Sequence, residues 1–312
     1  PGGVLVYASK PHSYRDLPIR AGELGIVHRH EMRGALHGLF RVRCFTQDDA
    51  HLFVRPDQLT DEIIGVVNLI DSVYQKFGFK YHVELSTRPD DSMGSDEDWA
   101  AAEGGLKAAL ERLNMPYEVN EGDGAFYGPK IDFHLEDSLG RTWQCGTVQL
   151  DFQMPLNFGL EFVDHDGSKK RPIMLHRVCF GSVERFIGVL TEHYAGAFPA
   201  WLSPVQVRLI PVAEAFDGYV KDVAAKLREH GVRVETDLSD DRFGKKIRNA
   251  SKDKIPFTLI AGGEDVEAGA VSFRLRDGSQ HNGVAVDRAV ELIVSHIEQR
   301  NNADQIDGLD EA

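Results

Sequence analysis

Near the start of the chain, one run of residues has the types and the spacing of a ligand site. Every second position from 41 to 51 is charged, aromatic or amide-bearing, and these positions are Arg41, Arg43, Phe45, Gln47, Asp49 and His51. On a single extended strand these side chains would share one face. Guanidiniums bind anions, a ring stacks on another flat ring, and an imidazole binds metals. The run therefore predicts the floor of a site for an anion, a flat ring and a metal.

A second charged run, His-Arg-His-Glu at 28–31, precedes the first and is separated from it by a segment with two glycines. Strand, turn and strand make an antiparallel hairpin, which would bring Arg29 and Glu31 beside Arg41 and Phe45. A glutamate can accept a hydrogen bond from an amine on a base, so the set suits a nucleotide. The alternative is a solvated hairpin with surface ion pairs, and the one-sided row disfavours it.

Three later segments carry further candidates. Residues 121–132 are rich in glycine and contain Lys130 at the start of an alternating strand, and the glycines are expected to let backbone approach a ligand. Residues 144–151 place Thr147, Gln149 and Asp151 on one strand face. Residues 176–186 run from an apolar strand into a helix, with Ser182 as its expected N-cap and Arg185 in its first turn.

The elements that position these residues divide the chain into two domains, because the pattern changes near 201–204. Before that point, mixed strands alternate with amphipathic helices expected at 58–76 and 96–113. After it, strands are expected at 205–211, 232–236, 257–261 and 271–275, and helices at 214–230, 245–253 and 284–297. This alternation predicts an α/β domain with a mostly parallel sheet covered on both sides. Residues 301–312 are acidic and unpatterned, so we expect a disordered tail there.

Composition limits the class of protein. The 312 residues include only three cysteines, with no paired spacing, which favours a reducing compartment. No apolar run is long enough to cross a bilayer and no signal-peptide pattern is present, so we expect a soluble, cytoplasmic protein with no membrane partner. The net charge of −14 opposes indiscriminate binding to nucleic acid, so any such contact needs a local basic patch.

The motifs resemble those of a known family. Residues 28–31 with 41–45 are similar to motif 2 of the class II aminoacyl-tRNA synthetases, and Gly-Ser-Val-Glu-Arg-Phe at 181–186 is similar to motif 3. Longer blocks at 13–18, 45–51, 85–89, 124–130 and 144–152 narrow the resemblance to threonyl-tRNA synthetases of the bacterial or organellar kind, up to about residue 299. The resemblance implies an α+β fold, with an antiparallel-sheet catalytic domain at 1–200 and an α/β anticodon-binding domain at 201–300.

The resemblance also implies roles. Arg29 would bind the α-phosphate of ATP and Arg41 the γ-phosphate, while Glu31 reads the adenine amine and Phe45 stacks on the base. The implied ATP site is completed by Gln144, Thr147, Ser182 and Arg185, with Mg²⁺ accompanying ATP. Arg29, Lys130 and Arg185 would be catalytic. The pocket for L-threonine would be formed by Gln47, Asp49, Tyr127 and Gln149. His51 and His176 match two of the three protein ligands of the family's Zn²⁺.

The implied zinc solves a selection problem. Shape alone cannot strongly exclude valine, which is isosteric with threonine, whereas a metal that requires an oxygen ligand can. The third ligand in the family is a cysteine just before a Pro-Gly-His sequence, and this chain begins Pro-Gly-Gly. Cys44 and Cys179 have the wrong spacing to replace it.

Motif 1 and an editing domain are also not found. We expect the chain to be the C-terminal part of a longer polypeptide. The alternative is a divergent paralogue that has lost the metal, but the other motif residues all survive.

In the second domain, a basic segment at 242–248 is the local patch that the acidic chain would need for RNA. The alternative for such a segment is simple solvation. By resemblance, Glu267 and Arg276 align with positions that read anticodon bases. The sequence therefore predicts a homodimeric threonine–tRNA ligase that binds ATP, L-threonine and tRNA(Thr). The alternative from another class is a non-catalytic, synthetase-like paralogue that binds RNA for regulation.

Overall fold

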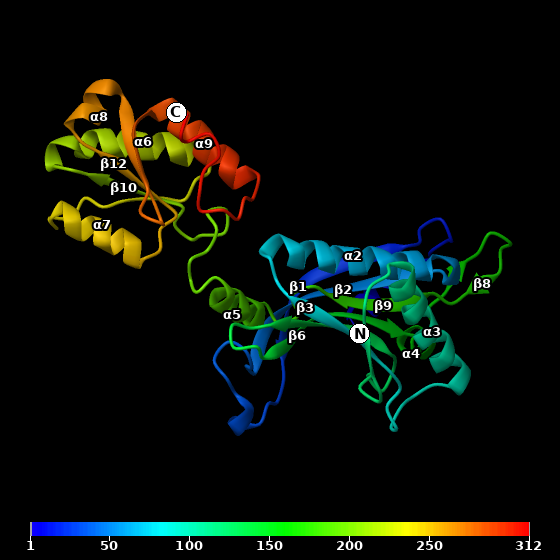
Figure 1. Ribbon diagram of the computed structural model, residues 1–312. Helices are drawn as coiled ribbons and strands as arrows, with labels where there is room; N and C mark the ends of the chain where they lie inside the picture. The colour runs from blue at the N-terminus through cyan, green and yellow to red at the C-terminus, as the bar shows by residue number, and fades with distance from the viewer. Residues whose placement is uncertain (1, 312) are drawn as a thin grey trace. The chain divides into compact units, whose positions relative to one another are not determined.

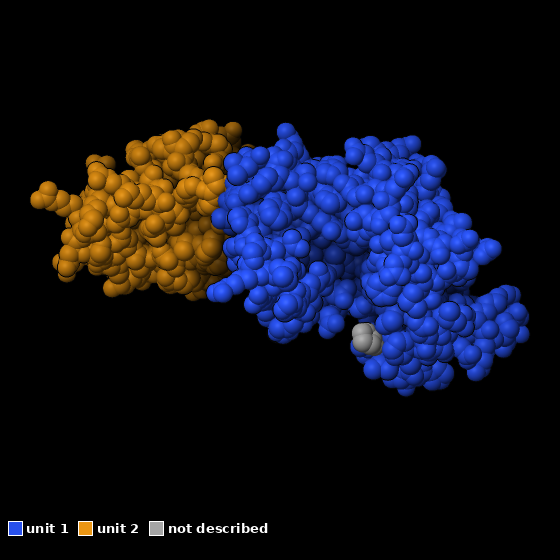
Figure 2. Space-filling model, turned by 90° about the horizontal axis from the view of Figure 1, so that it is seen from below, with its two compact units in different colours: residues 1–193 blue, residues 194–312 orange. Residues whose placement is uncertain are grey.

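The computed structural model describes residues 2–311, which form two compact units that meet in sequence between His193 and Tyr194 (Figures 1 and 2). The boundary between the two units therefore lies a few residues before the domain boundary expected at 200. Each unit has its own sheet and its own buried core. No helix among residues 2–311 is both long enough and apolar enough to span a membrane.

The first unit is built on a seven-stranded sheet with the order β1-β2-β9-β6-β5-β3-β4. Its strands are β1 (Ile19–His28), β2 (Cys44–Val54), β3 (Tyr81–Ser86), β4 (Glu118–Asn120), β5 (Lys130–Glu136), β6 (Thr142–Asp151) and β9 (Ile173–Val178). All neighbouring pairs are antiparallel except β3 with β4. The short strands β7 (Phe162–Val163) and β8 (Lys169–Lys170) pair separately. The expected antiparallel catalytic sheet is confirmed.

One face of this sheet is covered by the long helix Leu59–Phe77, whereas the other face carries polar groups and, near one end, the short helices Gly2–Ala8 and Gln153–Asn157. The helices of the unit are α1 (Gly2–Ala8), α2 (Leu59–Phe77), α3 (Asp96–Arg112), α4 (Gln153–Asn157) and α5 (Val183–His193), with 3₁₀ turns at Arg33–Ala35 and Pro56–Gln58. On β5, Ile131, Phe133 and Leu135 are fully buried, and the Phe133 ring meets Tyr74 of α2 (Figure 1). Burial of each such side chain contributes about 1.5–3 kcal/mol. Lys130 and the other alternate residues of β5 point to the opposite face.

The hairpin predicted from the two charged runs is present, but its second strand is shorter than expected. β1 pairs with β2 from Ile19 opposite Phe53 to His28 opposite Cys44. The strand therefore begins at Cys44, and the prediction of one continuous strand from Arg41 is wrong. The reason is a tight fold in the connection, where Arg41 exchanges backbone hydrogen bonds with His37. Arg41 and Arg43 consequently lie outside the strand.

The second unit is an α/β domain with a five-stranded sheet of order β11-β10-β12-β13-β14. Its elements are β10 (Val207–Pro211), a 3₁₀ turn at Glu214–Phe216, α6 (Asp217–Glu229), β11 (Val234–Thr236), α7 (Phe243–Lys252), β12 (Phe257–Ala261), α8 (Gly263–Ala268), β13 (Ala270–Leu275), β14 (Gln280–Ala285) and α9 (Val286–Glu298). β10 is parallel to β11 and β12, whereas β13 and β14 add as an antiparallel hairpin. The last helix starts at Val286 rather than 284 because the preceding residues form β14.

The C-terminal segment contradicts the expectation of a disordered tail. Ile306 and Leu309 are only 6% and 3% exposed and belong to the core of the second unit. Asp304 pairs with Arg276 at 2.7 Å, and Asp310 pairs with His281 at 3.2 Å. Two buried apolar side chains anchor this otherwise acidic segment. Because they are only two, the hydrophobic pattern of the sequence did not predict that the segment would pack.

Candidate active site

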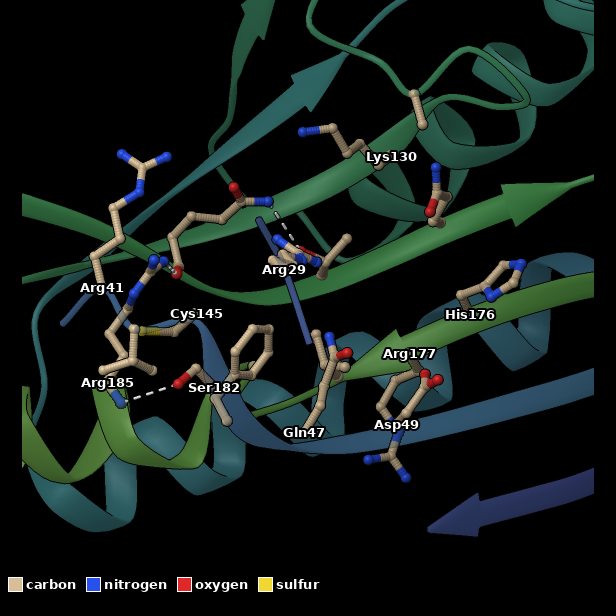
Figure 3. A pocket seen from close by; sticks show the side chains of 18 of the residues that line it. Arg29, Arg41, Gln47, Asp49, Lys130, Cys145, His176, Arg177, Ser182 and Arg185 are labelled. Carbon is tan, nitrogen blue, oxygen red and sulfur yellow. Dashed lines mark hydrogen bonds between the residues drawn. The ribbon is translucent and has the colours of Figure 1, made fainter. Parts of the chain in front are cut away.

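The face of the first sheet opposite α2 holds a cavity of about 340 Å³ (Figure 3). It is lined by all the residues predicted to contact ATP or threonine, namely Arg29, Glu31, Arg41, Phe45, Gln47, Asp49, Tyr127, Lys130, Gln144, Thr147, Gln149, Ser182 and Arg185, and by His176. His51 instead lines an adjoining cavity that it shares with His176 and Asp49. Segments up to about 150 residues apart in sequence therefore converge on one place, as predicted, although their individual roles stay predictions.

Cations gather at one end of the cavity. Figure 3 shows Arg41 and Arg185 toward one side, His176 and Asp49 toward the other, and Arg29 between them. The Arg29 guanidinium lies 5.3 Å from the centre of the Phe45 ring, and Arg41 pairs with Glu31 at 3.1 Å. Burial lowers the pKa of Arg185, and the guanidiniums of Arg41 and Arg29 lower it further. Three like charges held this close favour an anionic ligand.

Arg185 is fixed by the fold rather than left mobile. Its backbone N–H donates to Ser182 Oγ at 3.2 Å, so the predicted N-cap of α5 is confirmed. Its guanidinium donates to the carbonyl oxygens of Phe40 at 2.8 Å and Gln144 at 2.9 Å and lies 5.7 Å from the centre of the Trp143 ring. Arginine held in this way presents its charge in one direction without further ordering.

Trp143 is itself held by a buried aspartate that sequence reasoning missed. Asp137, whose side chain is 0% exposed, accepts hydrogen bonds from Trp143 Nε1 at 2.9 Å and Arg141 Nε at 2.6 Å. It also accepts from the backbone N–H groups of Leu139 and Arg141, each at 2.9 Å. Burial alone would raise the pKa of Asp137, but these hydrogen bonds outweigh it and bring the pKa down to about 2.

We expect Asp137→Asn to lower the free energy of unfolding at neutral pH by about 1–3 kcal/mol, because the amide cannot accept the same set of bonds from charged and backbone donors. The depressed pKa stabilises the fold only above the ordinary pKa near 4, and this contribution is lost as the pH falls toward about 2. Urea unfolding at pH 7 and pH 3 measures the difference between the two proteins. An equal difference at both pH values would contradict the assignment.

Lys130 belongs to a network centred on a second buried carboxylate. Its Nζ lies 2.6 Å from Asp132 Oδ2 and 3.0 Å from Asp123 Oδ2. Asp132, only 1% exposed, also accepts from the hydroxyls of Ser86 at 3.0 Å and Thr147 at 2.8 Å. Burial lowers the pKa of Lys130, but the two carboxylates raise it more, so the amine stays charged. Sequence reasoning missed Asp132, although its i+2 spacing from Lys130 on one strand face was a usable signal.

The histidine pair lies where the opposite end of the cavity meets the adjoining one. His51 and His176 are register partners on β2 and β9, and their rings meet edge to face with centroids 4.9 Å apart. His176 Nε2 lies 2.8 Å from a carboxylate oxygen of Asp151, whose side chain is 0% exposed. Asp49 approaches His51 to 3.6 Å. Burial lowers the pKa of His51, so its imidazole is neutral at neutral pH, which is the form that binds metals.

The threonine-pocket residues lie beside this pair. The Tyr127 hydroxyl donates to Gln149 Oε1 at 3.0 Å, and its ring lies 5.9 Å from that of His176. Gln149 is buried and Thr147 is half-buried, so the polar row predicted on β6 faces the cavity rather than bulk solvent. Together these groups offer several donors and acceptors to one small polar ligand.

The turn before α5 depends on a residue outside the predicted row. Asp48 accepts hydrogen bonds from the backbone N–H groups of Cys179 at 2.8 Å and of Phe180 and Gly181 at 3.0 Å each. Gly181 has φ +66°, and a Cβ there would lie 2.5 Å from the carbonyl oxygen of Cys145. Asp48 escaped prediction because it faces away from the alternating row on β2.

Two glycines of residues 121–132 lie against neighbouring backbone. A Cβ on Gly124 would lie 2.4 Å from the carbonyl oxygen of Thr87, and one on Gly128 would lie 1.8 Å from that of Leu150. These two glycines therefore admit neighbouring backbone, and the approach of this segment to a ligand stays a prediction. Their effect on the site is indirect, because they seat the loop that presents Tyr127 and Lys130.

The residues predicted to read RNA lie in the second unit and differ in exposure. Glu267 is exposed on α8, and Arg242, Lys245 and Arg248 of the basic segment are exposed, whereas Lys246 is buried and donates to the Asp237 carbonyl oxygen. Arg276 is turned inward. Its guanidinium bonds the carbonyl oxygens of Ala197, Phe198 and Lys254 and the carboxylate of Asp304. The anticodon roles of Glu267 and Arg276 stay predictions, and Arg276 would have to leave Asp304 to meet a base.

Comparisons with known proteins agree with this geometry. Residues 2–194 match the family described as tRNA synthetase class II core domain (G, H, P, S and T), and residues 206–296 match the anticodon binding domain family. Threonine–tRNA ligase of Acetivibrio thermocellus is 60% identical over 302 residues, which are 97% of this chain and 48% of the relative. That of Carboxydothermus hydrogenoformans is 63% identical over 276 residues, which are 88% of this chain and 44% of the relative. The chain thus spans about half the length of the curated relatives it matches.

A solved structure supports the same relationship. The crystal structure of the RNA binding domain of threonyl-tRNA synthetase from Cryptosporidium parvum Iowa II superimposes with a TM-score of 0.90 at 38% identity, covering 95% of this chain and 75% of that one. Both sheets of the present chain, with their helices, are therefore shared with a threonyl-tRNA synthetase. The chain belongs to the class II aminoacyl-tRNA synthetases and, within them, to the threonyl-tRNA synthetase family.

Proposed function

We propose that the protein is a threonine–tRNA ligase, which activates L-threonine with ATP to threonyl-adenylate and transfers the threonyl group to tRNA(Thr). The observation that carries the proposal is the single cavity in which an arginine-rich end and a histidine–aspartate end are joined through Arg29. Relatives at 57–63% identity that carry the name threonine–tRNA ligase support it.

Amino-acid activation joins a carboxylate oxygen to the α-phosphorus of ATP and breaks the bond to the pyrophosphate. The step needs no covalent enzyme intermediate, only the alignment of two anions and compensation of the charge that builds up. In this proposal Arg41 would hold the γ-phosphate, Arg185 would lie near the γ-phosphate or the adenine, and Arg29 and Lys130 would lie nearer the reacting groups. Phe45 offers a ring face for adenine, and Mg²⁺ accompanies the ATP phosphates.

The chain provides part of the zinc site of the family, through His51 and His176. His51 and His176 present two imidazoles from adjacent strands, and Asp151 orients His176 in the way that carboxylates orient zinc-bound histidines. Among residues 2–311, no cysteine lies close enough to His51 and His176 to form a group of three potential metal ligands with them. His51 and His176 would hold the ion with a third ligand from elsewhere. When bound, zinc supplies a Lewis acid for the amino and hydroxyl groups of threonine.

Further partners follow from the proposed activity. The second unit would bind the anticodon of tRNA(Thr), with Glu267 and Arg276 near the bases and the exposed cations of 242–248 near phosphates. As a translation enzyme the protein would work in the cytoplasm, and as a class II synthetase it would be a homodimer. Serine would also be activated, because loss of one methyl group costs only about 1–3 kcal/mol of discrimination.

Threonine-dependent ATP–pyrophosphate exchange tests the proposal, measured on the longest natural form of the protein with serine and valine in parallel. We expect exchange with threonine, weaker exchange with serine and none with valine. No exchange with any amino acid, in a protein that still binds ATP or tRNA, would overturn the proposal and favour the non-catalytic RNA-binding paralogue.

A further inference from the structure

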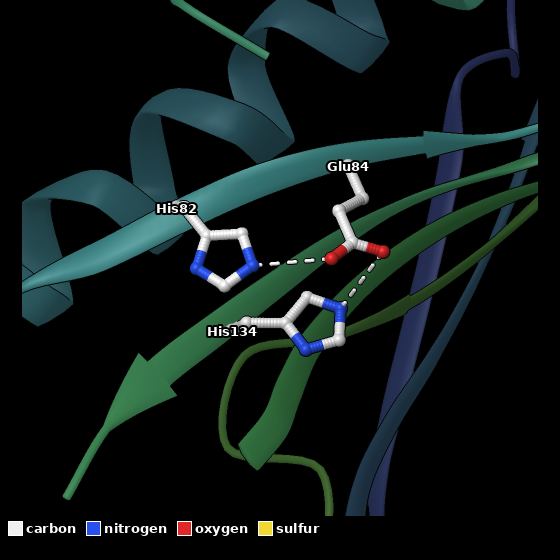
Figure 4. Close-up of side chains that lie close together, drawn as sticks. All are labelled: His82, Glu84 and His134. Atoms are coloured by element: carbon white, nitrogen blue, oxygen red, sulfur yellow. Dashed lines mark hydrogen bonds and ion pairs between the residues drawn. The ribbon is translucent and has the colours of Figure 1, made fainter. Parts of the chain in front are cut away.

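A second cluster of metal-binding side chains lies on the same sheet face, outside the cavity. His82 and Glu84 stand two residues apart on β3, and His134 is the register partner of His82 on β5 (Figure 4). One ligand atom from each residue lies within 4.8 Å of those of the other two. Among the residues that the structure describes, this is the one group of three histidine, cysteine, aspartate or glutamate side chains that meets this distance.

The separations match those of ligands around one ion. His82 Nε2 lies 3.1 Å from Glu84 Oε1, and His134 Nε2 lies 3.5 Å from Glu84 Oε2. Two ligands each about 2.0–2.1 Å from zinc at the tetrahedral angle are about 3.3–3.4 Å apart. The two imidazoles stack with centroids 5.0 Å apart, on strands that are paired by backbone hydrogen bonds. The ligands are therefore brought together by the sheet and need little ordering to bind.

Hydrogen bonding alone does not account for the cluster. His134 Nε2 is buried and has no hydrogen-bond partner among residues 2–311, although it lies close to the Glu84 carboxylate. A buried polar atom without a partner costs about 1–3 kcal/mol. A metal ion would use this nitrogen directly.

A second layer of contacts orients the carboxylate. Asn120 Nδ2 on β4 donates to Glu84 Oε2 at 2.8 Å, which is typical of the partners that hold metal-binding carboxylates in place. Glu84 has two carboxylate register partners, Asp132 on β5, which is already paired with Lys130, and Glu118 on β4, which is exposed.

We propose that His82, Glu84 and His134 bind a divalent transition-metal ion, best Zn²⁺, with a fourth position open to water. Two imidazoles and one carboxylate suit zinc better than Mg²⁺ or Ca²⁺, which prefer all-oxygen sites. The ion would join β3 to β5 beside Asp132, which is the register partner of Glu84 and the residue that anchors Lys130. It would be distinct from any ion held by His51 and His176, and its binding does not depend on the proposed ligase activity.

The test is a zinc titration of the whole chain carrying His51→Ala and His176→Ala, so that the other histidine pair cannot contribute. Isothermal calorimetry with ZnCl₂ should give one site per chain, and CoCl₂ should give the visible absorption of a four- or five-coordinate N/O site. Adding His82→Ala and His134→Ala should weaken zinc binding by about 100-fold or more, since loss of even an outer-shell partner costs 10–100-fold.

Two further variants provide an independent test and a control. Glu84→Gln keeps the shape of the side chain and should still weaken zinc binding by about tenfold or more. It therefore tests the proposed site even if the variant that lacks both histidines is misfolded. His165→Ala removes an exposed histidine that sits beside Asp164 at 3.1 Å and should leave binding unchanged. Zinc binding that is absent from the starting protein, or unchanged in Glu84→Gln and in a folded double variant, would overturn the proposal.

Discussion

Arg29→Ala is expected to lower kcat/KM for ATP in threonine-dependent pyrophosphate exchange by about 10²- to 10³-fold, the usual cost of removing one preorganised donor to a developing charge. Of the four arginines that line the cavity, Arg29 is the one whose guanidinium donates no hydrogen bond within residues 2–311, and it instead lies over the Phe45 ring. Its donors are therefore available to a ligand. Because it lies between the two ends of the cavity, it is the cation best placed for the α-phosphate (Figure 3).

The matched control for this prediction comes from the same connection between β1 and β2. Arg33 is exposed in the 3₁₀ turn Arg33–Ala35 and does not line the cavity, so Arg33→Ala should exchange at close to the parent rate. Thermal unfolding of both variants checks that the fold is kept. A change of less than about threefold in Arg29→Ala, or an equal loss in Arg33→Ala, would remove Arg29 from the phosphate site.

Much of the site could be predicted because strand alternation and motif resemblance report the same residues independently. Gln47 and Asp49 project from β2 into the cavity as the alternating row required, and Thr147 and Gln149 do so from β6. A strand face that lines a ligand site carries polar side chains, whereas a strand face that packs against a core carries apolar ones. The predicted strand extended too far toward the N-terminus, because Arg41 reaches the cavity from the folded connection that precedes the strand.

The supporting carboxylates were not predicted by the same reasoning. Asp48 accepts from backbone N–H groups of a segment distant in sequence, whereas Asp132 and Asp137 contact Lys130 and Trp143, which are close in sequence but are brought into contact only by the fold. A buried aspartate looks like a solvated one until its partners are known. For the same reason, the acidic segment after residue 300 looked disordered, although Ile306 and Leu309 bury it.

His176→Ala is expected to lower threonine-dependent exchange by about 100-fold or more while leaving tRNA binding unchanged. His176 lines both adjoining cavities, is fixed by the fully buried Asp151 and faces His51 across the β2–β9 pair. Loss of an outer-shell partner of a metal ligand typically costs 10–100-fold, so loss of a proposed ligand should cost at least as much. The residues proposed to bind RNA are in the other unit, so we expect them not to depend on this imidazole.

The comparison of amino acids separates a metal-binding role for His176 from a packing role. If His176 only fills space, His176→Ala should weaken threonine and serine activation alike and should admit valine no better than before. If it holds a metal that selects the hydroxyl, the variant should lose its preference for threonine over valine, because shape distinguishes these isosteres poorly. His165→Ala, which removes an exposed histidine paired with Asp164, should alter neither rate nor preference. Full threonine activation in His176→Ala would show that the zinc assignment is wrong, whatever the fate of the site at His82, Glu84 and His134.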